Sequence, residues 1–366
     1  MKRHRVLVTG VGGNIGQGIL KALRASRYPF YIVGVDMKPL SAGFSLVDRY
    51  KTLPRTGSQE YEEQFKAIAR QEPLEAVYIS SPNELEYFST HQEELKEEFG
   101  FKIFVNPPEV CRIGRDKFQT AEFLKNAGFP YPRTVLATDK EGVARLVQEC
   151  GFPLILKPRQ GFTSFNVFLV NSLKQIEAAS LLVPDLVLQE YLPEGEGEFT
   201  AGTVSGPDQK VRAGIVLKRE LFQGTTYRTE LMEDPEILRE VVRVVEALGA
   251  VGVCNVQFRR VEGKAVIFEI NPRFSGTSGV RYLYGFNDPE MMFELFCLNC
   301  EPEPPRLHPA VVLRYWNEIY LEGATFESLK KENSRHHGNQ TVIRDSQAEN
   351  QTLHVQAPSS QNHLAK

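Results

Sequence analysis

The stretch from Val6 to Gly18, VLVTGVGGNIGQG, constrains the fold more than any other part of this sequence. An apolar run ends there, three spaced glycines follow, and a helical pattern begins. Asp36 closes the next apolar run. This layout is typical of a tight strand-to-helix turn in a parallel sheet, with a helix N-terminus that can hold an anion and an acid that can meet a ribose. It predicts a Rossmann-like domain and raises the question of a bound dinucleotide.

Short apolar runs alternate with helical patterns up to about residue 112. The predicted strands are RVLVT, YIVGVD, AVYIS and KIFVN, and the predicted helices are GQGILKALRAS, SQEYEEQFKAIARQ and ELEYFSTHQEELKEEF. Alternation of this kind indicates a parallel sheet with helices on both faces. We therefore predict a Rossmann-like α/β domain over residues 1–112.

The pattern changes after residue 112, where adjacent strands joined by short turns favour antiparallel pairing and an α+β domain. The clearest pairs are EFTAGTVSG with KVRAGIVLKRE and GVCNVQFRRV with KAVIFEINPR. This second domain is predicted over residues 113–325, with one subdomain at about 113–188 and another at about 189–325. The polar, aperiodic segment 333–366 is predicted to be disordered.

Composition excludes several classes of protein. The net charge of −3 provides no general attraction for nucleic acid or an acidic membrane, and no apolar run approaches the roughly 18 residues of a membrane span. No signal peptide is expected at the start of the chain, and we predict a cytoplasmic protein. The five cysteines do not resemble a disulfide framework, and Cys297 and Cys300 lack the second pair of ligands that a zinc site needs.

A dehydrogenase is the first function that the glycine turn suggests, but the expected chemistry is missing. Short-chain dehydrogenases with a similar turn use a tyrosine followed four positions later by a lysine, and none of the 13 tyrosines here has one. His4 and His91 of the first domain do not lie in a context that suggests a proton donor. An NAD-dependent oxidoreductase remains only the less favoured alternative.

A stronger chemical signal lies between Val253 and Phe274, in VCNVQFRRVEGKAVIFEINPRF. Side chains of a strand alternate between its faces, so Glu269 and Asn271 point the same way. The preceding strand, joined by a short turn, can bring Gln257 alongside them. One carboxylate and two amide oxygens suit Mg²⁺, and Arg273 continues this face with a cation suited to phosphoryl oxygens.

These residues belong to a set of four motifs that resembles the ATP-grasp superfamily, in its carbamoyl phosphate synthetase-like and biotin carboxylase-like branch. The motifs are GRDKFQTAEFLKNAGFPYPRT, PLILKPR, LVLQEYLPEGEGEFT and FEINPRFSGTSG, in the order typical of the family. The resemblance covers about residues 1–325. It implies a Rossmann-like domain that precedes an ATP-grasp fold and does not bind NAD.

The resemblance also implies roles for individual residues. ATP would be bound by Lys117, Lys157, Glu190, Tyr191, Leu192 and Glu198, with the backbone of 190–192 at the adenine edge. Magnesium, or manganese in its place, would be held by Gln257, Glu269 and Asn271, with Arg273 and Lys157 as catalytic residues. The substrate would contact Ser275, Gly276 and Arg281, with Gly13 and Asn14 of the glycine turn as further candidates. Lys218, Arg219 and Arg228 could face the cleft or solvent.

One departure from the family concerns the glycine-rich lid after the strand lysine. It reads GFTSFNV here, where the family resembles GxGSxGV: Gly161 and Ser164 remain, whereas Thr163 and Asn166 replace glycines. Asn166 tolerates a positive φ better than most residues. Phe162 and Phe165 would make the lid bulkier.

Together these features predict an ATP-dependent carboxylate–amine ligase. Such an enzyme activates a small carboxylate as an acyl phosphate for attack by an amine or a similar nucleophile. The expected partners are these small molecules, and no nucleic acid or membrane is expected to bind. The protein could also form a homodimer. Neither a carrier motif such as MKM nor a second ATP-grasp half is found, so a single-site ligase is expected. A non-catalytic ATP-binding module is the main alternative.

Overall fold

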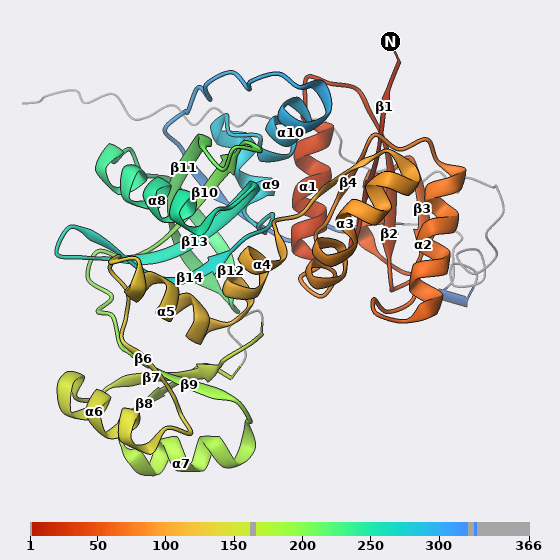
Figure 1. Ribbon diagram of the computed structural model, residues 1–366. Coiled ribbons are helices and arrows are strands. Elements are labelled where there is room, and N and C mark those ends of the chain that lie inside the picture. The colour runs from red at the N-terminus through yellow and green to blue at the C-terminus, as the bar shows by residue number, and fades with distance from the viewer. Residues whose placement is uncertain (1, 162–165, 321–325, 328–366) are drawn as a thin grey trace, which may run out of the picture.

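The computed structural model describes residues 2–161, 166–320 and 326–327. These residues form three β-sheets, one parallel and two antiparallel, with helices packed on them (Figure 1). The predicted combination of a Rossmann-like parallel sheet with antiparallel ATP-grasp sheets is confirmed. The lid residues 162–165 and the tail from 333 onward, for which we made predictions, lie outside the described residues.

The N-terminal sheet has the strand order β3-β2-β1-β4-β5, and every pairing in it is parallel. Its strands are β1 (His4–Val8), β2 (Phe30–Asp36), β3 (Arg49–Thr52), β4 (Ala76–Tyr78) and β5 (Lys102–Phe104). Its helices are α1 (Asn14–Arg24), the 3₁₀ turn η1 (Ala42–Leu46), α2 (Gln59–Gln71), α3 (Leu85–Phe99) and α4 (Pro108–Arg115). The sequence analysis missed only the short edge strand β3 among these strands.

Alternating side chains of β1 explain why helices cover both faces of this sheet. Val6 and Val8 pack with α1, whereas Leu7 between them packs with α2 and α3 on the opposite face. A strand buried on both sides must be apolar at successive positions. The run VLV satisfies this requirement.

The smallest sheet is antiparallel and lies at one end of the molecule, with the order β6-β9-β7-β8 (Figure 1). Its strands are β6 (Thr134–Leu136), β7 (Leu154–Pro158), β8 (Phe168–Val170) and β9 (Leu186–Glu190). Helices α6 (Lys140–Cys150) and α7 (Leu173–Leu182) cover it, and α5 (Lys117–Asn126) precedes it. Each of these three helices begins after an Asp or Ser whose side chain accepts a backbone N–H of the first turn.

The large sheet is antiparallel and has the order β14-β13-β10-β11-β12-β15. Its strands are β10 (Glu198–Ser205), β11 (Val211–Phe222), β12 (Thr225–Leu231), β13 (Gly252–Val261), β14 (Lys264–Asn271) and β15 (Val311–Leu313). Its helical segments are α8 (Pro235–Leu248), α9 (Ser278–Arg281), η2 (Tyr282–Tyr284), α10 (Asp288–Phe293) and a π-helical turn, η3 (Glu294–Leu298). The strand β15 was not predicted, and it pairs with the edge strand β12.

The N-terminal sheet and the large sheet share one core. Helix α1 packs closely on α9, because Gly18 faces Gly279: a Cβ atom on Gly18 would lie 2.9 Å from the backbone nitrogen of Gly279. Apolar side chains of β1, α1, β11, α9 and α10 belong to the same buried cluster. This packing holds the glycine turn beside the large sheet.

Candidate active site

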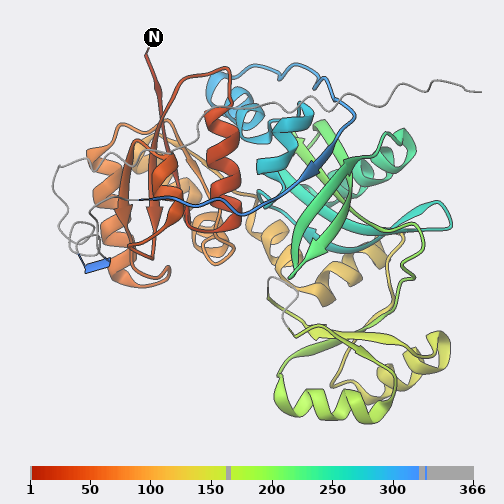
Figure 2. The same cartoon turned by 180° about the vertical axis from the view of Figure 1, so that it is seen from behind.

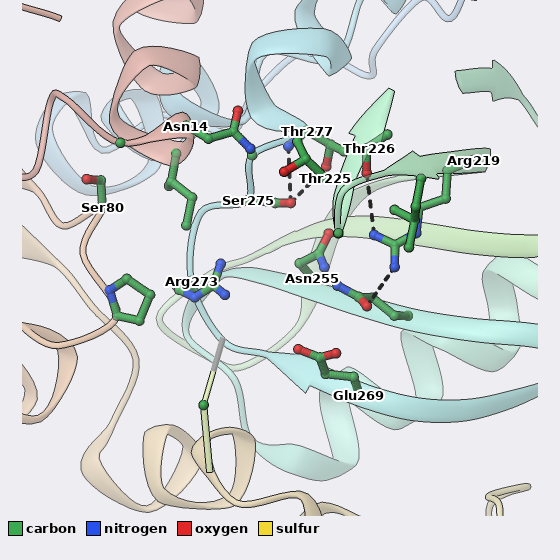
Figure 3. Close-up of a pocket in the computed structure, with 18 of the residues that line it drawn as sticks. Asn14, Ser80, Arg219, Thr225, Thr226, Asn255, Glu269, Arg273, Ser275 and Thr277 are labelled. Carbon is green, nitrogen blue, oxygen red and sulfur yellow. Dashed lines mark hydrogen bonds between the residues drawn. The ribbon is translucent and has the colours of Figure 1, made fainter. Parts of the chain in front are cut away.

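A cavity of about 960 Å³ lies where the three sheets meet, which is a volume suited to a nucleotide with a second small ligand. Its wall includes the glycine turn, the strands β7, β9, β10, β11, β13 and β14, and the loop 275–277. Figure 3 shows side chains from these distant segments converging on one space.

The predicted magnesium ligands lie on neighbouring strands. Gln257 of β13 is paired directly with Glu269 of β14, and both line the cavity. Asn271 is buried beside the wall: its Nδ2 donates to Glu269 Oε1 at 2.9 Å, and its Oδ1 accepts from Arg273 at 2.8 Å. The structure therefore brings all three together, with Asn271 joining Glu269 to Arg273. The pair that faces the cavity is Gln257 and Glu269.

Cations surround the Glu269 carboxylate. Burial acts to raise the pKa of this carboxyl, but Lys117, the Asn271 amide, Lys157 and Arg219 together hold it below its ordinary value. An ionised carboxylate in such a setting can accept a metal ion. Within the described part of the chain, no cluster of three or more His, Cys, Asp or Glu side chains could hold a metal. The donor set of one carboxylate with amide oxygens fits a magnesium ion that takes its other ligands from phosphate and water.

Lys157 approaches this region from the small sheet, and Lys117 approaches it from the start of α5. Lys157 is buried on β7, where its Nζ donates to Gln189 Oε1 at 2.7 Å, and burial lowers its pKa to about 8. Lys117 is the first residue of α5, and its Nζ donates to the Gly161 carbonyl at 3.2 Å. Both ammonium groups line the cavity. Burial likewise lowers the pKa of Arg273 to about 10, so its guanidinium remains a cation at neutral pH.

The predicted adenine-binding segment follows β9 and also lines the cavity. The backbone N–H of Glu190 donates to the Arg133 carbonyl at 2.8 Å, and the Leu192 carbonyl accepts from the Arg259 guanidinium. The Arg259 guanidinium also lies over the Tyr191 ring, 5.8 Å from its centroid. Arg259 therefore braces this segment, and the sequence analysis missed it.

Three apolar side chains provide a slot next to this segment: Ile155 of β7, Phe268 of β14, and Val167 just before β8 line the cavity. Phe268 precedes Glu269 and by simple alternation should face away from it. The β13–β14 register shifts between Gln257 and Phe258, which is a bulge that lets both Phe268 and Glu269 reach the cavity. No signal in the sequence marks this bulge.

Three basic residues were left open between cleft and solvent. Arg219 lines the cavity (Figure 3). It donates to Glu198 Oε1 at 2.6 Å and to Gln257 Oε1 at 2.8 Å. Lys218 is exposed and does not line the cavity. Arg228 is exposed and pairs with Glu220 at 3.0 Å. Only Arg219 of the three belongs to the site.

Some of the predicted substrate residues line the cavity, and one does not. Gly13, Asn14, Ser275 and Gly276 line the cavity. Arg281 does not: its side chain is 2% exposed, and it pairs with Asp288 at 3.0 Å and with Asn255. A guanidinium held behind the wall by a buried carboxylate has no surface for a substrate. The expectation that Arg281 binds a carboxylate is therefore withdrawn.

The glycine turn differs from a dinucleotide-binding turn in what it holds. Both oxygens of Asp36 accept backbone N–H groups, from Gly12 at 2.7 Å and from Lys38 at 2.8 Å, so this carboxylate braces the turn. The 3₁₀ turn η1 packs on it so closely that a Cβ atom on Gly43 would overlap the Val11 carbonyl. Asp36, which a dinucleotide-binding turn would use to bind a ribose, thus holds the glycine turn in place. These contacts favour a scaffold role for the turn.

In the lid, the structure describes Gly161, Asn166 and Val167. Asn166 has a φ of 59°, the left-handed conformation that a glycine would otherwise supply. This agrees with the tolerance expected of asparagine. Thr163 and the two phenylalanines lie outside the described residues.

The comparisons with known proteins agree with this geometry. A family described as "ATP-grasp in the biosynthetic pathway with Ter operon" matches residues 182–319. The carbamoyl phosphate synthase large chain of Neisseria meningitidis is 25% identical over 304 residues, which cover 75% of this chain and 27% of that protein. The chain thus spans about a quarter of the length of the curated relatives it matches.

Solved structures share the fold. N5-carboxyaminoimidazole synthetase from Staphylococcus aureus has a TM-score of 0.66 at 16% identity, covering 92% of this chain and 87% of that one. The biotin carboxylase domain dimer of the Hydrogenobacter thermophilus 2-oxoglutarate carboxylase, a complex with MgADP, ADP and bicarbonate, has a TM-score of 0.64 at 16% identity, covering 83% and 71%.

The family match shows an ATP-grasp domain over residues 182–319. The carbamoyl phosphate synthase relatives are similar to the chain beyond that segment, and the solved structures share its fold. No helix among the described residues has the length and apolar character needed to span a bilayer.

Proposed function

We propose that this protein is an ATP-dependent ligase that activates a small carboxylate as an acyl phosphate for attack by an amine or a similar nucleophile. The observation that carries the proposal is the single cavity in which Lys117, Lys157 and Arg273 surround the Gln257–Glu269 pair. Phosphoryl transfer needs little covalent chemistry from the protein, and it depends on positioning and on cations that stabilise the developing charge. The cavity provides both.

The nucleotide would lie along β9, with adenine in the slot beside Tyr191 and Leu192 and with Glu190 and Glu198 as candidates for the ribose. Glu198 lines the cavity, and the bonds it accepts from Arg219 fix its position. Lys117 and Lys157 would then contact the phosphates. Arg273 would face the phosphoryl group in transfer.

Magnesium fits at Glu269 and Gln257, with Asn271 as the third group of the proposed set. When bound, the ion would neutralise phosphate charge and orient the transferred group. The chain's own residues hold the reactants around it: Glu269 supplies the negative charge, and Arg219 holds the Gln257 amide in place. The remaining ligands would be phosphate oxygens and water.

In the proposed reaction a carboxylate oxygen of the first substrate attacks the γ-phosphorus, and ADP leaves. The nucleophile's nitrogen then attacks the acyl carbon, and inorganic phosphate leaves. Asn14 and Ser275 lie at the end of the cavity away from Glu269 (Figure 3), and Gly276 also lines the cavity. We assign this end to the substrate. The partners proposed are therefore two small molecules, and the proposed location is the cytoplasm.

The test is ADP formation by the purified protein with Mg-ATP and pooled amino acids and small carboxylic acids, followed by mass spectrometry of the products. A ligase forms ADP and a condensed product only when its substrates are in the pool. NAD(H) should not raise the melting temperature, whereas Mg-ATP should, because a ligand bound only by the native state stabilises it. Stabilisation by NAD(H) alone would restore the dehydrogenase hypothesis.

A non-catalytic ATP-binding module is the second candidate, and the replacement of a lid glycine by Asn166 is the observation that favours it. Asn166 reproduces the positive φ but not the bare backbone of glycine. Binding of Mg-ATP without substrate-dependent ADP from a broad pool would support the module over the ligase.

A further inference from the structure

Arg314 joins three parts of the cavity wall although it does not line the cavity itself. It follows β15, which pairs with β12 at the edge of the large sheet, and its backbone N–H donates to the Tyr227 carbonyl at 2.9 Å. Figure 2 shows the blue segment after β15 crossing from this sheet toward the N-terminal domain. The backbone pairing thus places the side chain between the two domains.

The guanidinium donates to three lining residues from three separate elements. One terminal nitrogen donates to Asn14 Oδ1 at 2.7 Å and to the Gly276 carbonyl at 3.1 Å. The other donates to the Thr226 carbonyl at 3.2 Å. Asn14 begins α1, Gly276 follows β14, and Thr226 lies on β12.

Arg314 also determines how the Asn14 amide is oriented. A guanidinium has donors and no acceptor, so the amide must turn its oxygen toward Arg314 and its nitrogen away. The nitrogen lies over Gly276, where a Cβ atom would overlap it. Figure 3 shows this nitrogen directed toward the loop that carries Ser275. Asn14 therefore holds a hydrogen-bond donor beside Gly276, in the part of the cavity wall that both residues line.

Ser275 adds a second donor to the same end of the cavity. Its side chain is buried, and its Oγ accepts from the Thr277 backbone N–H at 3.2 Å and from Thr277 Oγ1 at 2.9 Å. An oxygen that accepts both of these bonds keeps its own hydrogen for another partner. Donors at Asn14 and Ser275 select a ligand group made of acceptor oxygens.

We propose that Arg314 is a positioning residue that fixes Asn14 as a donor, so that this end of the cavity binds a carboxylate or phosphate group of the substrate. This inference rests on the proposed function for the role of the substrate. The contacts of Arg314 themselves do not depend on it. Arg314→Gln removes the charge and the fork of donors, whereas Arg314→Lys keeps the charge with a single donor group.

Hydrogen exchange of the full chain without any ligand provides the first measurement. In Arg314→Gln, peptides covering residues 12–18 and 275–281 should exchange faster than in the wild type, and Arg314→Lys should be intermediate. Arg306→Gln is the matched control, since Arg306 is an exposed arginine shortly before β15. Exchange in Arg314→Gln equal to that of the control would overturn the positioning role whether or not the protein is a ligase.

Kinetics provides the second measurement, with the acid pool and a separate pool of phosphorylated small acids to distinguish the two sources of acceptor oxygens. Arg314→Gln should raise the substrate concentration for half-maximal ADP formation by about tenfold, the effect of one charge-assisted hydrogen bond. The KM for ATP and the kcat should not change. Asn14→Asp, which replaces the donor by an acceptor, should lose more than Asn14→Ala.

A double variant separates positioning from general damage. If Arg314 acts through Asn14, then Asn14→Ala should cost little more in the Arg314→Gln background, and the two effects should not add. Additive effects, or an equal rise in the KM for ATP, would overturn the proposal. If neither pool stimulates the wild type, the ligase proposal fails, while the exchange measurement still decides the role of Arg314.

Discussion

Replacing Glu269 by glutamine changes one charge at the centre of the proposed site and keeps the shape of the side chain. Glu269 is a buried carboxylate among the cations Lys117, Lys157, Arg219 and Arg273, and Glu198 is a second carboxylate that pairs with Arg219. Without the negative charge of Glu269, the repulsion between these cations is less well compensated. The carboxylate that would hold magnesium is lost in the same step.

Two effects of different size follow from this change. Turnover should fall by at least about a hundredfold, or about 2.7 kcal/mol of barrier, because metal-assisted charge stabilisation contributes several kcal/mol. Stability should fall by about 1 to 3 kcal/mol, between the values for an exposed ion pair and for a buried one. The pKa of Lys157, already lowered to about 8 by burial, should fall further because the charge of Glu269 opposes that shift.

Single-turnover ADP formation, calorimetric titration with ATP and a thermal melt measure these effects. Glu262→Gln is the matched control, since it makes the same substitution at an exposed position in the turn between β13 and β14. Near-normal turnover in a folded Glu269→Gln variant would place the metal elsewhere. An unchanged or higher melting temperature would refute the argument that the surrounding cations depend on this carboxylate.

Four further predictions concern other parts of the site and its support. Raising the pH from about 7 to about 9 should weaken Mg-ATP binding, because Lys157 loses its proton as the pH passes its pKa of about 8, and Lys157→Arg should remove much of this dependence. Between that value and its ordinary pKa of 10.5 the unfolded chain binds more protons than the folded one, so the contribution of this lysine to stability should rise with pH in melts without nucleotide. Arg259→Met should raise the Kd for ATP about tenfold by titration calorimetry, because it removes the bond to the Leu192 carbonyl, whereas the exposed Arg239→Met on α8 should not change it. Gly18→Ala should lower the free energy of unfolding by about 1 to 3 kcal/mol in urea titrations, because the added methyl group would meet the Gly279 backbone. Gly195→Ala is the control, since the space around Gly195 is open, and it should leave the free energy of unfolding unchanged. Equal effects of the two substitutions would contradict the close packing of α1 on α9.

Local patterns were sufficient to predict most of the sheets and the core of the site. The alternation of apolar runs with helical patterns predicted four of the five strands of the parallel sheet. The period of two along β14 placed Glu269 with Asn271, and the structure joins their side chains by a hydrogen bond. The short turn brought Gln257 near them, but Gln257 lies directly opposite Glu269 only because of the bulge, which the sequence does not mark.

The surroundings of motif residues that do not follow a strand period were harder to predict. Arg281 is a residue type that often binds a substrate carboxylate, but the carboxylate of Asp288 holds its guanidinium behind the cavity wall. Asp36 stands where a ribose-binding acid would stand, but two backbone N–H groups occupy it. Whether a polar side chain faces a cavity or a buried partner depends on the packing around it, and residue type alone does not decide this.

The sequence by itself determined most of the strands and helices and the order of the motifs, because each follows from residues that are close together in the chain. Tertiary structure decided which basic residues contact residues of the site. Arg259 reaches the carbonyl of Leu192, 67 positions away, and Arg314 reaches Asn14 across 300 positions. The return of β15 to the edge of β12 makes the second contact, and it depends on the packing of α1 against α9. Such contacts arise only once separate elements have packed, so no local pattern encodes them.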